Sequence, residues 1–217
     1  PGQKLPAGHI YDSNRYVIAA MPKRLDVQLI DLGLLPDEPG AIEQAFQQAM
    51  KEADVLVTSA GVSVGEADYT RQILSKLGQI NFWQVAIKPG KPFAFGKLNN
   101  CWFFGLPGNP VAAVVTLEQL VQPVLRKLSG EVIQSSAKLL QAECDVPLKK
   151  QPGRQDYQRG WYWQGETGLK VKTSGAQSSG MLSSIANANC YIVLPRDSSS
   201  LPAGEMVSIL PFSDLLR

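Results

Sequence analysis

The sequence predicts an α/β protein with a doubly wound, mostly parallel sheet, followed by a small β-rich domain. Residues 1–135 alternate helix-like with strand-like apolar patterns, and the strand-like runs are nearly uniformly apolar, as in buried parallel strands. Residues 136–217 instead predict short strands separated by Pro, Gly and Ser turns. We therefore place a domain boundary near residue 135, and a chain of 217 residues is long enough for two small domains.

The chain opens with alternating helices and strands. Residues 14–21 predict a short helix capped by Ser13 or Asn14 and ended or kinked at Pro22. Residues 27–34 predict a strand. A second helix follows, whose apolar stripe has helical spacing and consists of Ile42, Ala45, Phe46, Ala49 and Met50.

The same alternation continues to the domain boundary. Residues 55–58 form a short apolar strand that leads into a loop of small residues. A helix follows with Ile73, Leu74 and Leu77 on one face. Residues 80–87 then predict a strand, residues 97–100 the turn of a hairpin-like pair, and Val111 the start of a long helix.

The second domain has a different pattern. Strands are expected within residues 138–148, 155–163, 169–173, 190–195 and 206–211, with one helical stretch near residues 180–187. Short strands joined by turns predict a barrel-like fold or a half-open sandwich.

Composition excludes several function classes. With 21 basic and 19 acidic residues the formal charge is +2, which gives no electrostatic reason to expect a nucleic-acid or membrane partner. Cys101, Cys144 and Cys190 lie far apart in apolar or alternating runs, which argues against a disulfide scaffold or a thiolate zinc site. His9 is the single histidine and lies in a loop-like segment. No apolar run approaches the roughly 20 residues of a membrane span, so a reducing cytoplasm is expected.

The first segment that could bind a ligand is TSAGVSVGEAD, a strand followed by a small-residue loop that opens a helix. Gly61 and Gly65 allow backbone N–H groups to approach an anion, and Ser59 and Ser63 add hydroxyl donors. The alternative is a plain turn in which Asp68 caps the helix.

The second segment is KPGKP, after a predicted strand. Lys88 and Lys91 place two ammonium groups three residues apart on a backbone stiffened by two prolines, which suits a phosphate or another oxyanion. The alternative is a solvated loop.

The third segment, GLPGNP, also lies between a strand and a helix. Two prolines and two glycines restrict its backbone strongly, which favours rigid placement of backbone donors for a ligand. Asn109 could also cap the following helix, because Pro110 suits its first turn.

Together the segments SAGVSVGEADYT, KPGKPFAFG and GLPGNPVAA resemble the MoeA-type molybdopterin molybdotransferases, whose relatives include the C-terminal region of gephyrin. The resemblance extends from PGQKLPAGHIYDSNR through RQDYQRG and TSGAQSSG to LPAGEMVSILPF. It implies a molybdopterin-binding domain at residues 1–135 and a C-terminal β domain at residues 136–217. The implied reaction is insertion of molybdate into adenylylated molybdopterin with release of AMP, assisted by Mg²⁺, in a homodimer.

The resemblance also implies roles for single residues. Asp37 and Asp68 match catalytic acids that would hold Mg²⁺, and Lys88 and Lys91 match lysines near molybdate. The implied contacts with the pterin nucleotide, besides these lysines, are Ser59, Gly61, Ser63, Gly65, Pro107, Gly108, Asn109 and Pro110.

From the second domain, Arg159 and Ser179 match oxyanion contacts. By themselves, Arg159 could be a cation stacked on its aromatic neighbours and Ser179 a polar loop residue.

The sequence also departs from the family pattern. Ala60 stands where a second glycine is common, and Gln84 where a basic residue is usual. The family has two further N-terminal domains and a first strand of this layer, which ends in a Thr/Ser-Gly-Asp-Glu motif. We therefore expect a C-terminal fragment with an open sheet edge, covered by another copy or by the missing segment, and with weak or no catalysis alone.

Three functions remain open at this point. The chain could be part of a molybdate-inserting enzyme, or a binding or scaffolding module that retains a pterin phosphate. A third possibility is another phosphate-ligand enzyme on the same scaffold.

Overall fold

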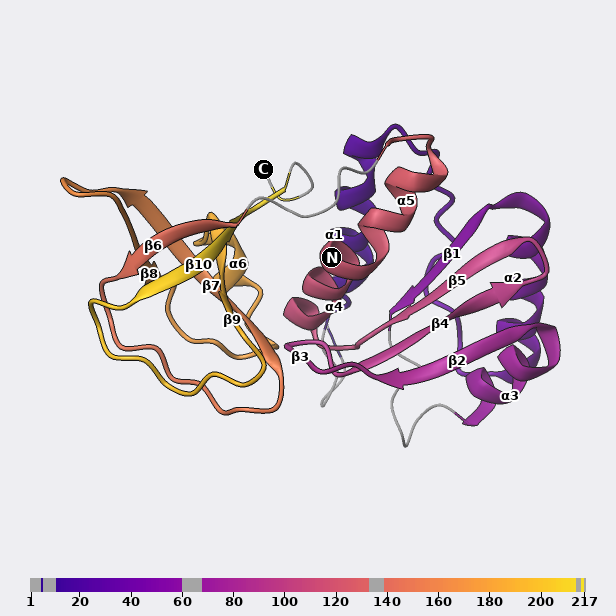
Figure 1. Cartoon of the computed structure of the whole chain (residues 1–217). Coiled ribbons are helices and arrows are strands. Elements are labelled where there is room, and N and C mark those ends of the chain that lie inside the picture. The colour runs from indigo at the N-terminus through magenta and orange to yellow at the C-terminus, as the bar shows by residue number, and fades with distance from the viewer. Residues whose placement is uncertain (1–4, 6–10, 60–67, 133–138, 214–215, 217) are drawn as a thin grey trace.

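The computed structural model describes residues 5, 11–59, 68–132, 139–213 and 216, which form two sheets with associated helices (Figure 1). The first sheet has the strand order β1-β5-β4-β2, and the second has the order β3-β7-β8-β6-β10-β9. The strands of the first sheet are β1 (Val55–Ser59), β2 (Gln79–Gln84), β4 (Pro92–Leu98) and β5 (Cys101–Leu106). The α/β class predicted for this part of the chain is therefore confirmed.

The first sheet is mixed, which corrects the expectation of a mostly parallel sheet. Strands β1 and β5 pair in parallel, whereas β4 pairs antiparallel with both β5 and β2. The hairpin between β4 and β5 turns at Asn99, whose φ is 52°, and confirms the turn predicted at residues 97–100. Apolar runs report that a strand is buried on both faces but carry no information on the direction of its neighbour.

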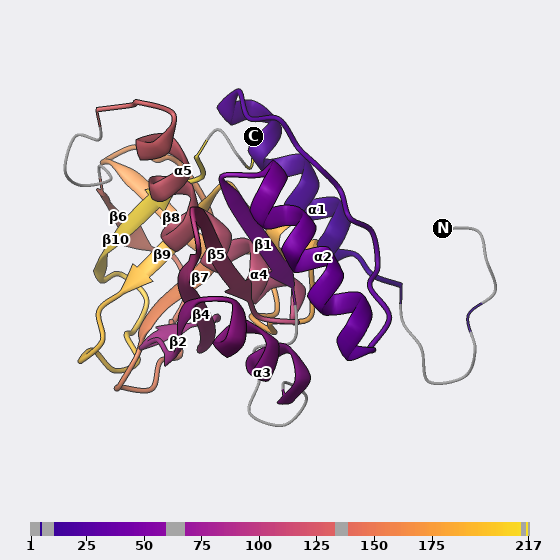
Figure 2. The ribbon, with the colours of Figure 1, turned by 90° about the vertical axis from the view of Figure 1, so that its right-hand side faces the viewer.

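Helices cover both faces of this sheet (Figure 2). Helices α2 (Pro39–Glu52) and α3 (Asp68–Leu77) pack on one face, where Phe46 and Leu74 meet Phe103. Helices α1 (Asn14–Ala20), α4 (Pro110–Thr116) and α5 (Gln122–Leu128) pack on the other face, around Phe104. A 3₁₀ turn, η1 (Met21–Leu25), continues α1, and a π-helical turn, η2 (Leu117–Val121), joins α4 to α5.

Two predicted strands differ in the structure. Residues 27–34 contain no strand, and Leu29, Ile30 and Leu34 are exposed. Their apolar pattern predicts a strand, but a strand also requires a neighbouring strand to pair with. The apolar pattern does not show whether such a neighbour is present. Residues 80–87, predicted as one strand, are divided between β2 and the two-residue strand β3 (Ile87–Lys88), which belongs to the second sheet.

The second sheet curls into a barrel, as predicted. Its other strands are β6 (Leu140–Cys144), β7 (Gln155–Gln164), β8 (Leu169–Thr173), β9 (Cys190–Leu194) and β10 (Met206–Pro211). An additional antiparallel pairing between β7 and β9 closes the sheet. Apolar side chains such as Val171, Ile192 and Ile209 fill the interior. The short helix α6 (Ser183–Ala186) confirms the helical stretch expected near residues 180–187.

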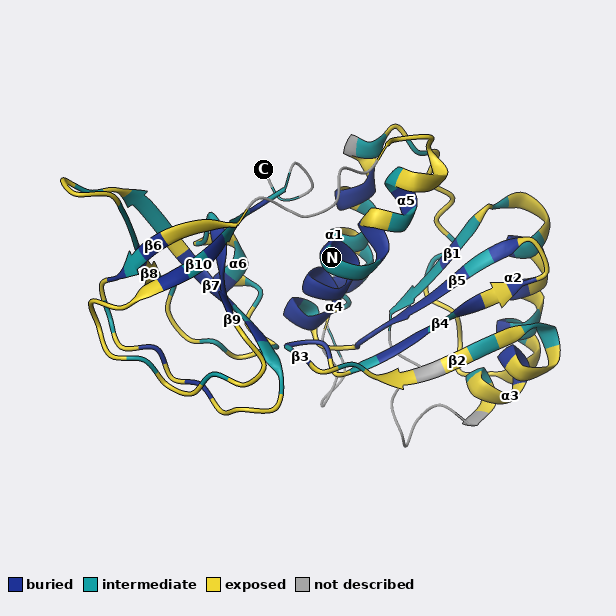
Figure 3. Cartoon of the chain, viewed as in Figure 1, coloured by how far each residue is buried: buried dark blue, intermediate teal, exposed yellow. Residues whose placement is uncertain are grey.

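Helix α4 connects the two sheets (Figure 3). Residues 111–116 of this helix are all buried, with Ala113 and Val114 facing the first sheet. On its opposite side Val111 and Val115 pack against Tyr191 and Phe212. The helix is thus a shared core element, which fixes the barrel against the first sheet.

A second connection is polar. Glu118, in η2, is 5% exposed, and its Oε1 accepts hydrogen bonds from the backbone N–H and the hydroxyl of Ser213. Burial raises the pKa of the Glu118 carboxyl, an effect that its hydrogen bonds only partly offset.

Asn14 joins α1 to two loops of the first sheet. Its Nδ2 donates to Ser59 Oγ at the end of β1 and to the Gly108 carbonyl after β5, both at 2.7 Å. Asn14 is 8% exposed, so both hydrogen bonds are shielded from water. The helix predicted at residues 14–21 is confirmed, but Ser13 at its N-cap forms no capping hydrogen bond through its side chain.

None of the helices in the described ranges has the length and apolar character that a bilayer crossing requires.

The first prediction concerns Asn14. Asn14→Ala removes two partly buried hydrogen bonds, each of which contributes about 0.5–1.5 kcal/mol, so the free energy of unfolding should fall by about 1–3 kcal/mol. Urea denaturation of both proteins measures this change. Gln47→Ala on the exposed face of α2 is the control and should change stability by less than about 0.5 kcal/mol. Equal stability of Asn14→Ala and the wild type would show that this contact does not hold the loops.

The second prediction concerns pH. Because the folded-state pKa of Glu118 is raised, the folded protein holds this proton more tightly than the unfolded chain. Its contribution is fully present below the unfolded pKa of about 4.3 and is lost as the pH rises through the folded value. Glu118→Gln keeps the shape without the titration. The stability of the wild type relative to Glu118→Gln should therefore fall in urea unfolding experiments as the pH rises above the unfolded pKa of about 4.3. A stability difference between the two proteins that does not change with pH would contradict the raised pKa of Glu118.

Candidate functional site

Two of the three predicted ligand loops begin side by side at one end of the first sheet. Strands β1 and β5 run parallel, and Ser59 pairs with Leu106 at their carboxyl ends. The loops that follow are residues 60–67, which lie outside the described residues, and the GLPGNP turn. The third loop reaches the same end, because β4 begins at Pro92 and its Ala94 pairs with Gly105. Carboxyl ends of parallel strands are where ligands bind in open α/β sheets.

The GLPGNP turn presents its backbone to this end. Pro107 is buried, Gly108 and Asn109 are exposed, and Pro110 is the first residue of α4. Asn109 occupies the N-cap position, but its side chain makes no capping hydrogen bond, which corrects the expected cap. The backbone N–H of Val111 instead donates to the carbonyl of Ser179, so the loop of Ser179 lies against the start of this helix.

The two lysines of KPGKP are placed differently. Lys88 is in β3, and a cis peptide bond precedes Pro89. Gly90 has a φ of 119°, and a Cβ at this position would lie 2.6 Å from Thr116 Cγ2 of α4, so only glycine fits this close turn. Beyond it Lys91 is exposed. Of the two lysines, Lys88 is among the residues that line the neighbouring cavity and Lys91 is not.

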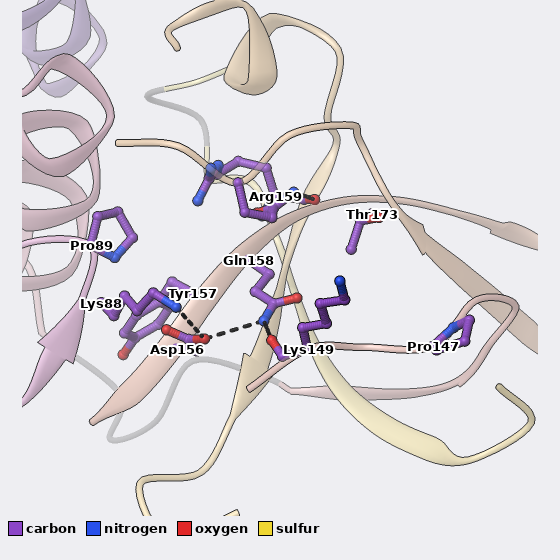
Figure 4. Close-up of a pocket in the computed structure, with 10 residues that line it drawn as sticks. Lys88, Pro89, Pro147, Lys149, Asp156, Tyr157, Gln158, Arg159 and Thr173 are labelled. Atoms are coloured by element: carbon purple, nitrogen blue, oxygen red, sulfur yellow. Dashed lines mark hydrogen bonds and ion pairs between the residues drawn. The ribbon is translucent and has the colours of Figure 1, made fainter. Parts of the chain in front are cut away.

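This cavity has a volume of about 340 Å³ and lies between KPGKP and the barrel (Figure 4). It is lined by Lys88, Pro89, Pro147, Lys149, Asp156, Tyr157, Gln158, Arg159, Thr173 and Gln177. Three of these side chains are cationic and one is a carboxylate. Two paired strands of the second sheet supply three of the charged groups: Lys88 lies in β3, and Asp156 and Arg159 lie in β7. An excess of cations suits a small anion.

Arg159 is the most buried of the cations, with 1% of its surface exposed. Its Nε donates to Ser184 Oγ at 3.1 Å, and its Nη2 donates to the Ser178 carbonyl at 3.3 Å. Burial lowers the pKa of Arg159, while Tyr191 and Asp156 partly oppose this effect. The guanidinium is thus held beside the cavity by hydrogen bonds rather than stacked on the aromatic residues that follow it in sequence.

Asp156 completes the charged set. Its side chain is 3% exposed, and its Oδ2 lies 3.5 Å from Lys88 Nζ. Gln158 Nε2 donates to the same oxygen at 3.2 Å and to the Lys149 carbonyl at 2.8 Å. Figure 4 shows these contacts as a chain that runs along the cavity wall from Lys149 to Lys88.

Several predicted site residues are not brought into this cavity. Ser179 contacts α4 through its backbone and is not among the lining residues, although Gln177 is. Asp37 is exposed before α2. Gly61, Ser63 and Gly65 lie outside the described residues, as does the side chain of Asp68. Within the described part of the chain, no three His, Cys, Asp or Glu residues cluster as metal ligands would.

Sequence reasoning missed several residues of this region. Asp156, Gln158 and Lys149 line the cavity, and Asn14 holds two of the loops together. RQDYQRG carried part of the signal, because it matched the family pattern, but the sequence did not show that Asp156 and Gln158 are buried. Asn14 gave only a capping signal, which the structure does not bear out.

Comparisons with known proteins agree with this arrangement. The family model described as a probable molybdopterin binding domain matches residues 2–127, and the model of the MoeA C-terminal region (domain IV) matches residues 141–212. A molybdopterin molybdenumtransferase of Haemophilus influenzae is 50% identical over 99% of this chain and 54% of its own length. Gephyrin of Dictyostelium discoideum is 31% identical over 95% of this chain and 33% of its own length.

Solved structures agree as well. A molybdopterin biosynthesis MoeA protein of Pyrococcus horikoshii has a TM-score of 0.79 and 26% identity, over 98% of this chain and 51% of that one. The chain spans about half the length of the molybdenumtransferases that it matches. From its matches over both parts, the chain belongs to the molybdopterin-binding domain family, and its second part is a MoeA C-terminal region.

Proposed function

We propose that this chain acts in molybdenum cofactor biosynthesis, in the insertion of molybdate into adenylylated molybdopterin with release of AMP. The observation that carries the proposal is the cavity in which Lys88, Lys149 and Arg159 surround a space of about 340 Å³. Molybdate is a small dianion and requires several cationic or hydroxyl donors at once. The 50% identity to a molybdopterin molybdenumtransferase supports the same reaction class.

The pterin nucleotide would bind at the adjacent strand ends. Ser59 and Gly108 lie at neighbouring positions there, joined by Asn14, and the GLPGNP backbone is exposed beside them. The glycines and Ser63 of residues 60–67 would complete the phosphate contacts. Anionic phosphates at such strand ends gain from backbone N–H donors.

Mg²⁺ would neutralise the phosphates of the nucleotide when bound. Protein sites for Mg²⁺ with phosphates need only one or two carboxylates, because water and phosphate oxygens fill the other positions. Asp37 is an exposed carboxylate and has the right chemistry for one of them. We assign Asp37 and Asp68 to this role, and Ser179, beside Arg159 in the fold, to an outer contact with molybdate.

A second candidate function is a binding or scaffolding module without catalysis. It rests on the 31% identity to a protein named gephyrin. We further propose a cytoplasmic homodimer with no nucleic-acid or membrane partner.

Release of AMP separates the two functions. The chain and a protein of the relatives' full length that contains it would each be given adenylylated molybdopterin and molybdate, and AMP would be followed by chromatography. The enzymatic proposal predicts molybdate-dependent AMP release by the longer protein and weak or no release by the chain alone. No release by either protein, with pterin still bound, would support the binding module.

The third prediction concerns the two lysines in the longer protein. Lys88→Ala removes a cation from the cavity, so the KM for molybdate should rise by about tenfold while pterin binding changes little. Lys91→Ala should have a smaller effect, because Lys91 is exposed outside the cavity lining. Steady-state kinetics and pterin titration measure the two quantities. Equal loss of both functions in either variant would mark that lysine as a general phosphate or structural contact.

A further inference from the structure

The cavity proposed to bind an oxyanion also contains a carboxylate, Asp156, which contacts Lys88. A carboxylate beside an oxyanion site repels the ligand, and a site built only for affinity would not contain one. Yet Asp156 lines the cavity and has almost no exposure to solvent. A buried carboxylate without a partner is costly, so its neighbours show what it does there.

The partners of Asp156 lie in β3 and in β7, two paired strands of the second sheet. In the parallel pairing of β3 with β7, Lys88 lies directly opposite Asp156. The Asp156 carboxylate is also fixed from behind by Gln158, whose Nε2 is in turn held by the Lys149 carbonyl. Next to that carbonyl, Lys150 is buried, and its ammonium donates to the carbonyls of Gln151 and Arg154. The anchor of Lys88 is therefore rigid.

Lys88 itself is only partly committed to this contact. Its side chain is 45% exposed, and one of its three ammonium donors suffices for Asp156. The remaining donors are available to a ligand in the cavity. A free lysine side chain samples many rotamers, and fixing it before the ligand arrives removes that entropic cost from binding.

We propose that Asp156 is a positioning residue of the oxyanion site, which holds the Lys88 ammonium at the cavity through the β3–β7 pairing. This role rests on the proposed function, because it requires that an oxyanion bind beside Lys88. The positioning role predicts a change in dianion affinity opposite to the one that charge repulsion alone predicts. Removing the Asp156 charge should weaken the binding of a dianion, although it also removes a repulsion.

The test measures binding of molybdate, and of tungstate as its nearly isosteric heavier analogue, to the chain by isothermal titration calorimetry in a phosphate-free buffer. Asp156→Asn should bind molybdate about fivefold more weakly than the wild type, within the range of coupling between contacting residues. Gln158→Met retains the Asp156 charge but loosens its support, and should weaken binding less. Glu143→Gln disrupts a lysine–carboxylate contact of 3.4 Å on the far strands β6 and β8, and should leave binding unchanged.

A double-mutant cycle separates positioning from general damage to the fold. If Asp156 acts through Lys88, then Asp156→Asn should cause no further loss in a Lys88→Ala background. Unchanged or tighter binding by Asp156→Asn, or an equal loss in both backgrounds, would overturn the positioning role. Absence of binding by the wild type and by the longer protein would instead overturn the oxyanion site itself. If Asp156→Asn does not fold, the Gln158→Met variant, with and without Lys88→Ala, decides by the same criteria.

Discussion

The arrangement of the site depends on a short pairing, in which the two residues of β3 join the edge of β7. Strand β3 follows directly after β2 of the first sheet, yet it adds to the barrel of the second. This pairing places Lys88 opposite Asp156 and, three residues further along β7, brings Arg159 to the same cavity. Without it Lys88 would not lie beside Asp156, and the cavity would lose one of its three cationic side chains.

Packing around α4 keeps this short pairing in place. Two residues of parallel pairing are too few to fix one sheet against another, but α4 contributes apolar side chains to both cores. Gly90 lets the KPGKP loop approach this helix at Thr116. At the start of the helix, the backbone N–H of Val111 donates a hydrogen bond to the carbonyl of Ser179. Helix α4 thus contacts both the KPGKP loop and the Ser179 loop beside Arg159. Because both loops pack on one helix, the two sides of the cavity belong to one packed unit.

The sequence allowed most elements to be predicted, because strands and helices of this chain have strong apolar periodicity. The buried stripe of α2 followed from such patterns, and the barrel is one of the two folds that they predict for the second domain. Gly, Pro and Ser at strand ends indicated the three candidate ligand loops. The direction of β4 did not, since burial is independent of direction, and residues 27–34 show that an apolar run can lack a partner. Asp156 was missed because the side chain that it contacts, Lys88, is 68 residues away in the chain.

The central claim is that an oxyanion binds in the cavity between KPGKP and the barrel. A crystal of this chain soaked in tungstate tests it most directly, because tungsten scatters anomalously and its position is found independently of the protein phases. The account predicts one strong anomalous peak within hydrogen-bond distance of Lys88 Nζ and beside Arg159, which disappears in Lys88→Ala crystals. A peak only at other positions, or a peak that Lys88→Ala leaves unchanged, would contradict it.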